Sequence, residues 1–400
     1  MGVPGRGPHG STALASRLHT RSQLWGVGAI AEAPEGRSGP DEQQLQLSGR
    51  RALITLVAAA ILAIGAIALI GHLSDYSRIL DIADEADLRW LAACAAGEVL
   101  AYFGYILAYH ELARAQGGPR MSYWTVSRVV ALGFGATAIG SSAGGLATDF
   151  WALHRAGAPV HEAAQRTLAL NTLKWGVLSG AAMISSALIL AGVGEAPLGM
   201  TLTWLIVVPL CVLAAAWVSA PRRGDRLSTV PARVATPRGR GPRGWWRYLV
   251  RALRVGLADA IGGVVFLRRL LQKPRRHARG LLGYPLYWMG QLVVVYAALR
   301  AFDADLGLAP LVVAFTTGYV VTALPLPAGG AGGVEASLAL TLNAVGVPLE
   351  SALLAAVVYR IVTFWLPLIP TLALLPMIRR LDDDLPHTPR EEAEPAMVAG

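Results

Sequence analysis

Long apolar stretches separated by short polar segments fill the chain between residues 52 and 377. Seven of them carry few charged residues, at 52–71, 88–109, 168–193, 198–220, 281–299, 306–324 and 351–377. Each is close to the ~20 residues that an α-helix needs to cross a ~30 Å hydrocarbon core. The pattern predicts an all-α polytopic membrane protein with about seven or eight transmembrane helices.

Two further stretches depart from this pattern. Thr125–Ala147 is apolar but contains five glycines, which indicates a broken or re-entrant element. Ala336–Val347 is short and follows a glycine pair at Gly329-Gly330, much as the first stretch holds one at Gly144-Gly145. Paired discontinuities of this kind mark the central site of many transporters, so we expect two loosely similar halves. Chance recurrence of small residues is the alternative.

Composition and charge agree with a membrane protein. The chain is 54% hydrophobic and 15% charged, whereas soluble chains carry about 25% charged residues. Sixteen of its 35 Lys and Arg residues fall within residues 221–280, beside apolar runs, as in cytoplasmic loops. The net charge of +9 therefore reflects topology, and we expect no nucleic-acid partner. In this block, Trp245–Leu271 carries Arg247, Arg251 and Arg254 on one side, which predicts an amphipathic helix on an anionic lipid surface.

We therefore divide the chain into a disordered cytoplasmic tail (1–48), a transmembrane domain (49–378) and an acidic tail (379–400). The expected location is the cell inner (cytoplasmic) membrane. Arg379-Arg380 place the C-terminus inside, whereas counting Ala336–Val347 as a half-helix places it outside. The two cysteines and eight histidines form no recognisable ligand pattern, so we expect no metal and no cofactor.

The segment from Leu324 to Glu335 has the most distinctive composition. Its prolines end the preceding helix, and its four glycines allow backbone conformations closed to other residues. Glu335 then begins a helix, whose positive end favours a carboxylate and whose free N–H groups favour an anion. The alternative is a tight connection in which Gly329 and Gly333 pack closely.

Several ionisable residues lie within or beside the apolar runs. Arg360 is the most informative, because a buried arginine needs a partner or a polar cavity. Glu335 and a lipid phosphate are candidate partners; snorkelling to the interface with Tyr359 is the alternative. The other candidates for a polar path are Glu98, His110, Glu111, Asp149 and Lys174.

The C-terminal third resembles a known family. The run Pro325–Glu335, Val345–Val347, Tyr359-Arg360 and Trp365–Pro367 resemble the transmembrane region of lysylphosphatidylglycerol synthases and related flippase-like proteins. Ala328 stands where that family has a second proline. The segment 143–149 lacks the arginine of the family's glycine-acid-x-x-arginine element. The resemblance implies movement of lipids or lipid-linked precursors between leaflets, without the aminoacyltransferase domain.

We accordingly expect a flippase or transporter rather than an enzyme, with a polar head group bound at the glycine-rich loop. Its partners are membrane lipids, either phospholipids or lipid-linked precursors, and any protein partner is unknown. The candidate substrate-binding residues are Gly329, Gly330, Gly332, Gly333, Glu335, Tyr359, Arg360, Glu98, Gly144, Gly145 and Asp149. The alternatives are a membrane-embedded glycosyl- or lipid-modifying enzyme and a non-catalytic membrane partner.

Overall fold

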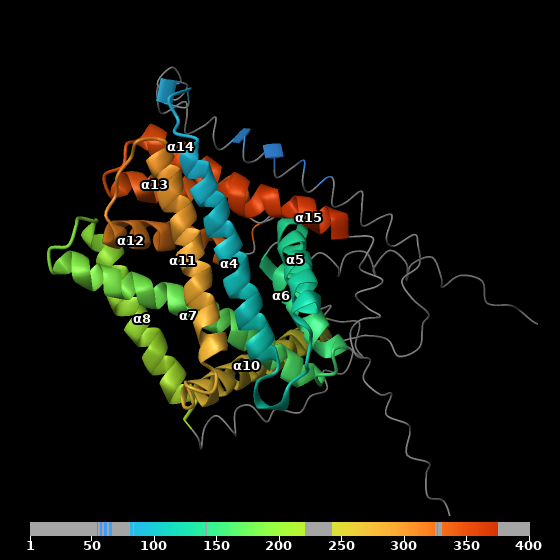
Figure 1. Cartoon of the computed structure of the whole chain (residues 1–400). Coiled ribbons are helices and arrows are strands. Elements are labelled where there is room, and N and C mark those ends of the chain that lie inside the picture. Colours follow the sequence, from blue (N-terminus) through green and yellow to red (C-terminus); the bar gives the residue numbers. More distant parts are fainter. Residues whose placement is uncertain are drawn as a thin grey trace, which may run out of the picture.

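The structure, a computed structural model, describes residues 81–82, 84–140, 142–220, 242–324, 326 and 330–374, with a few isolated positions between 54 and 65. Its regular elements are all helical (Figure 1), which confirms the all-α class. The two expected tails, most of the 52–71 run, residues 221–241 and Gly329 lie outside this part of the chain, as do the side chains of Arg247 and Arg251.

Five helices in the described part are long and apolar enough to cross a membrane. They are α4 (Arg89–Ala113), α7 (Val160–Leu190), α8 (Leu198–Val218), α11 (Ala278–Ala301) and the segment Leu349–Ile369. On α8, eight large apolar side chains are 43% to 65% exposed, among them Leu202, Ile206, Leu210 and Leu213. In water such a surface would be unfavourable, whereas lipid chains solvate it. The chain is therefore a multi-pass membrane protein.

Helices α4 and α11 pack along a seam of glycines near the centre of the domain (Figure 1). Gly97 faces Gly290, and Gly104 faces Gly283, so the two helices run antiparallel. A Cβ atom on Gly104 would lie 2.5 Å from the backbone nitrogen of Tyr287, which leaves no room for a side chain. Such close backbone contact is a main source of helix association in lipid. This seam fixes the register between α4 and α11.

Helices α5 (Tyr123–Gly140) and α6 (Ser142–Arg155) form an antiparallel pair that covers and extends beyond the expected broken stretch. Gly144 and Gly145 lie inside α6, where a Cβ atom on Gly144 would collide with the carbonyl oxygen of Ala136. The expectation of a break at Gly144-Gly145 is therefore wrong, because these glycines allow close packing within a hairpin. The first helix of the pair ends at Gly140, before residue 141.

Two polar regions of the sequence are largely helical. In the segment His154–Arg166, His154 lies in the last turn of α6 and His161 lies in the first turn of α7. The helix expected at Trp245–Leu271 is present as α10 (Pro242–Leu271), and it is amphipathic. It packs against α7 and crosses near the ends of α4 and α11 in Figure 1. Its placement on the cytoplasmic face stays a prediction.

The C-terminal region is more broken than its apolar runs indicate. The expected span at 306–324 is α12 (Leu308–Tyr319) followed by one 3₁₀ turn, η3 (Val320–Ala323), and is shorter than a full crossing helix. The short helix α13 (Gly333–Ala344) begins three residues before the expected one.

The final span also contains an irregularity. It consists of α14 (Leu349–Arg360), a π-helical turn η5 (Ile361–Trp365) and α15 (Leu366–Leu374). Such π-turns inserted in α-helices are frequent at functional sites. The order of one long helix, two short packed helices and a further long segment thus occurs twice, from α4 to α7 and from α11 to α15. The two-halves interpretation stays a prediction.

Candidate functional site

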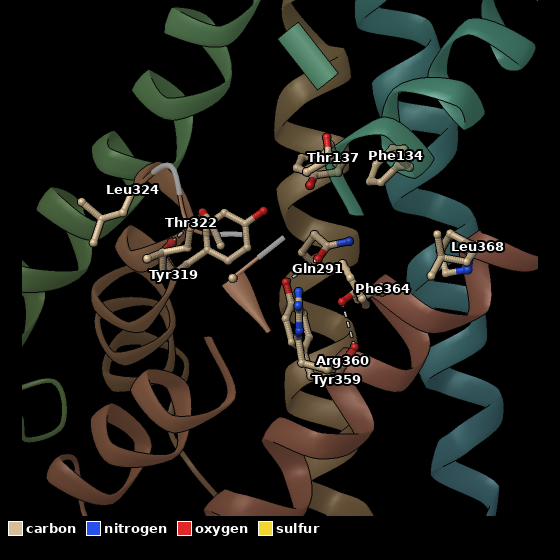
Figure 2. Close-up of a pocket in the computed structure, with 15 residues that line it drawn as sticks. Phe134, Thr137, Gln291, Tyr319, Thr322, Leu324, Tyr359, Arg360, Phe364 and Leu368 are labelled. Atoms are coloured by element: carbon tan, nitrogen blue, oxygen red, sulfur yellow. Dashed lines mark hydrogen bonds between the residues drawn. The ribbon is translucent and has the colours of Figure 1, made fainter. Parts of the chain in front are cut away.

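Two adjoining cavities lie between the helices of the domain. The smaller has a volume of about 90 Å³ and the larger about 230 Å³. They share one wall, formed by Phe134, Thr137, Tyr287, Tyr319 and Thr322. Figure 2 shows the smaller cavity, with Tyr359 and Arg360 on the final span, Gln291 on α11 and Tyr319 and Thr322 opposite.

A buried ion pair stands at the smaller cavity. The Nε of Arg360 donates a hydrogen bond of 3.1 Å to Oε1 of Glu335, and the two residues are only 7% and 2% exposed. This confirms Glu335 as the predicted partner. The guanidinium carbon also lies 4.1 Å from the ring centroid of Phe364, one helical turn further on. The pair therefore ties the start of α13 to the end of α14.

The glycine-rich loop contacts the second carboxylate oxygen of Glu335. The backbone N–H of Gly332 donates a hydrogen bond of 2.7 Å to Oε2 of Glu335, so both carboxylate oxygens have partners. Gly330 and Gly332 have φ angles of +76° and +81°, which side chains other than glycine adopt at a cost. Gly333 opens α13 without such a requirement. The backbone conformations expected of glycine thus occur at Gly330 and Gly332.

A second polar chain runs from the smaller cavity into the glycine seam. The hydroxyl of Tyr359 donates to Oε1 of Gln291 at 2.7 Å, and Nε2 of Gln291 donates to Oε2 of Glu98 at 3.0 Å. All three residues are buried. The other oxygen of Glu98 has no hydrogen-bond partner among the described residues. Glu98 therefore does not line the cavity but is linked to it through Gln291.

Our sequence analysis missed Gln291. Gly97-Glu98 on α4 and Gly290-Gln291 on α11 occupy equivalent places along the seam, so the glycine contact brings Glu98 and Gln291 together. The sequence did carry a signal for this contact. In each of two apolar runs a polar residue follows a glycine, and a second glycine, Gly104 or Gly283, stands seven residues from the first.

The larger cavity holds a different pair of charges, Asp149 on α6 and Lys174 on α7. Asp149 is 6% exposed and accepts one hydrogen bond, of 3.3 Å, from the Tyr105 hydroxyl. The Lys174 ammonium lies 6.0 Å from the centroid of the Tyr105 ring. Among the residues that the structure describes, this ammonium has no hydrogen bond and no ion pair within 4.0 Å. Both charges thus have unused hydrogen-bonding capacity.

The structure brings the candidate residues together only in part. Gly330, Tyr359 and Arg360 line the smaller cavity, and Gly145 and Asp149 the larger one. Gly332 and Glu335 lie directly behind Arg360, whereas Gly144 and Gly333 line neither cavity. The hydroxyl-bearing residues of the shared wall gave no signal in the sequence. In the described ranges no three His, Cys, Asp or Glu side chains gather, so we assign no metal site.

This geometry lies in a part of the chain that matches a known family. A family model for the lysylphosphatidylglycerol synthase TM region matches residues 55–371. The matched range contains the glycine seam, both cavities and the broken helices. A search of the curated proteins found no match.

Proposed function

We propose that this chain, which belongs to the family of the lysylphosphatidylglycerol synthase TM region, moves phospholipids or lipid-linked precursors between the leaflets of the bacterial inner membrane. The observation that carries the proposal is the pair of adjoining cavities, each lined in part by ionisable side chains, inside a bundle of apolar helices. Ionisable side chains at membrane depth are costly and commonly mark a substrate path. Here Arg360 and Lys174 bring positive charge to opposite sides of one shared wall.

The depth and size of the cavities fit a head group. Gln291, on the smaller cavity, is the fourteenth of the 24 residues of α11 and thus lies near the middle of that helix. The two volumes, about 90 and 230 Å³, are each below the ~300–1,000 Å³ of sites that enclose a drug-sized ligand. A head group therefore enters while the acyl chains stay in the bilayer. Its phosphate oxygens accept hydrogen bonds from Lys174 and the threonines of the shared wall.

Transfer requires that the cavities open to one leaflet and then to the other. The irregular points of the backbone at η3 and η5 border the cavities, and they are the places where helix segments change direction at least cost. We propose that transfer is passive or driven by an ion gradient. In the second case Glu98, which hydrogen bonds link through Gln291 to Tyr359 at the smaller cavity, is the proposed proton carrier. The protein then acts as a transporter and not as an enzyme.

The proposal is tested by reconstituting the purified protein in liposomes and measuring transfer of labelled phospholipids between leaflets. Glycosylated and aminoacylated lipids are assayed in parallel. We expect Lys174→Gln to slow transfer by about tenfold or more, as befits the loss of one charge-assisted hydrogen bond. Arg275→Gln removes the same charge from an exposed position in the turn before α11 and serves as the control. Absence of transfer for every lipid, with folded protein, would reject the flippase function.

A further inference from the structure

A third cavity, the junction cavity, lies away from the two described above and shares no lining residue with them. It has a volume of about 950 Å³ and lies where the end of α4, the loop after it, the end of α10 and the turn before α11 meet. Figure 1 shows these helix ends beside one another at one end of the domain. This is the end that the basic loops predict to be cytoplasmic.

The lining of the junction cavity is strongly basic. Five Arg or Lys side chains contribute to it, together with one carboxylate, that of Glu111. Glu111 is engaged by Arg114, at 2.7 Å. Arg120, Lys273 and Arg276 make no ion pair with any residue in the described part of the chain. Cations from three separate segments thus face one space with little compensating negative charge.

The lining also includes a buried histidine. His110, only 8% exposed, has its Nδ1 3.7 Å from Oε1 of Glu111 and without a hydrogen-bond partner among the described residues. The N-terminus of α11 also opens here, directly after His277, so the positive end of that helix adds to the field. Burial, and then the charge of Arg276, lower the pKa of His277, so its imidazole adds little positive charge at neutral pH.

The partial negative charge at the C-terminus of α4 is neutralised. The α4 C-terminus would present carbonyl oxygens, and hence negative potential, to the same space. Instead Nη1 of Arg166 donates to the carbonyl oxygens of Leu112, Ala113 and Ala115. The positive contributions of the cavity therefore stand largely unopposed, which favours occupation by an anion.

We infer that the junction cavity is a binding site for a phosphorylated ligand that carries more than one negative charge. Its volume lies at the upper end of the ~300–1,000 Å³ typical of small-ligand sites and accommodates such a group. Two sources share this chemistry, the head group of an anionic lipid at the membrane surface and a soluble polyphosphate compound. The inference does not rest on lipid transfer through the other two cavities.

The test uses the full chain in uncharged detergent or phosphatidylcholine nanodiscs. One arm measures binding of inorganic pyrophosphate by calorimetry, and the other measures enrichment of cardiolipin around the protein by native mass spectrometry. The variant K273A/R276A removes two lining cations. The matched control, R275A/R279A, removes two exposed cations of the same segment that do not line the cavity.

We expect K273A/R276A to weaken binding about tenfold or more, and R275A/R279A to change it by less than about twofold, because only the first pair contacts the ligand. Arg120→Ala, in the loop after α4, should weaken the same binding. Binding confined to cardiolipin identifies a lipid head group, and binding confined to pyrophosphate identifies a soluble ligand. Equal loss in the variant and its control, or no binding in either arm, would overturn the inference.

Discussion

One carboxylate and one basic side chain lie in or beside each of the two central cavities, but the two pairs are held in different ways. Beside the smaller cavity, Glu335 accepts hydrogen bonds from Arg360 and from the backbone of Gly332, so both of its oxygens are used. In the larger cavity Asp149 accepts one longer bond from Tyr105, and the Lys174 ammonium has no such partner in the described part of the chain. The residue types are similar, but the charged groups of the first pair have more hydrogen-bond partners than those of the second.

This difference separates two roles. A saturated, buried ion pair joins parts of the backbone, here α13 and α14, and its loss damages the fold. Unsaturated charges contribute little to folding and keep their hydrogen-bonding capacity for a ligand. We therefore assign Glu335 and Arg360 mainly to holding the broken helices, and Asp149 and Lys174 mainly to the head group. Substitutions at each pair test this assignment, with the free energy of unfolding as the common measure.

The largest effect is expected at the ion pair. Arg360→Ala leaves the Glu335 carboxylate buried without its cation, which should cost about 3 to 5 kcal/mol of unfolding free energy. Unfolding by sodium dodecyl sulfate in mixed micelles measures this loss. The double variant R360M/E335Q removes both charges and should recover most of the stability. If Arg360→Ala unfolds like the wild type but loses lipid transfer, Arg360 belongs with the ligand and the comparison fails.

The glycine seam should matter to both cavities, because Gln291 lines the smaller one and Tyr287 lines both. A Cβ atom on Gly290 would lie 2.6 Å from the backbone nitrogen of Ala101, so Gly290→Ala must push α4 and α11 apart. We expect a loss of about 1 to 3 kcal/mol in the same unfolding experiment. Gly180→Ala in α7, where a Cβ atom meets nothing within 4 Å, is the control. It should be neutral or slightly stabilising, and equal losses would exclude close packing as the cause.

The sequence was sufficient where one local property decides the outcome. Apolar length predicted the five long helices, and the cost of a lone cation in an apolar run predicted that Arg360 has a partner in Glu335. Gly144 shows why the rest was out of reach. A glycine pair serves equally as a helix break or as a packing surface, and only the neighbouring Ala136 carbonyl decides between them. Gln291 likewise acquires its role from the register of α4 against α11.

A smaller effect is expected from the buried hydrogen-bond chain. Tyr359→Phe removes the donor to Oε1 of Gln291 and leaves that acceptor buried, which should cost about 1 to 2 kcal/mol. Tyr105→Phe makes the same change in the larger cavity, where the bond to Asp149 is longer. Its cost should be lower, under about 1 kcal/mol. A larger loss for Tyr105→Phe would show that Asp149 is held as firmly as Glu335. The charged groups at the two cavities would then not differ in how fully they are hydrogen-bonded.

The smallest change in stability is expected at Lys174. Because this ammonium has no ion pair within 4.0 Å in the described part of the chain, Lys174→Met should change the unfolding free energy by less than about 1 kcal/mol. A double-mutant cycle with Asp149→Asn measures the coupling of the two charges directly, and it should likewise stay below about 1 kcal/mol. The corresponding cycle for R360M and E335Q should give a coupling several times larger, since their atoms lie 3.1 Å apart. Strong coupling at Lys174 would mean that its charge is already used by the fold, so that a head group entering the larger cavity would have to displace Asp149 before it could bind.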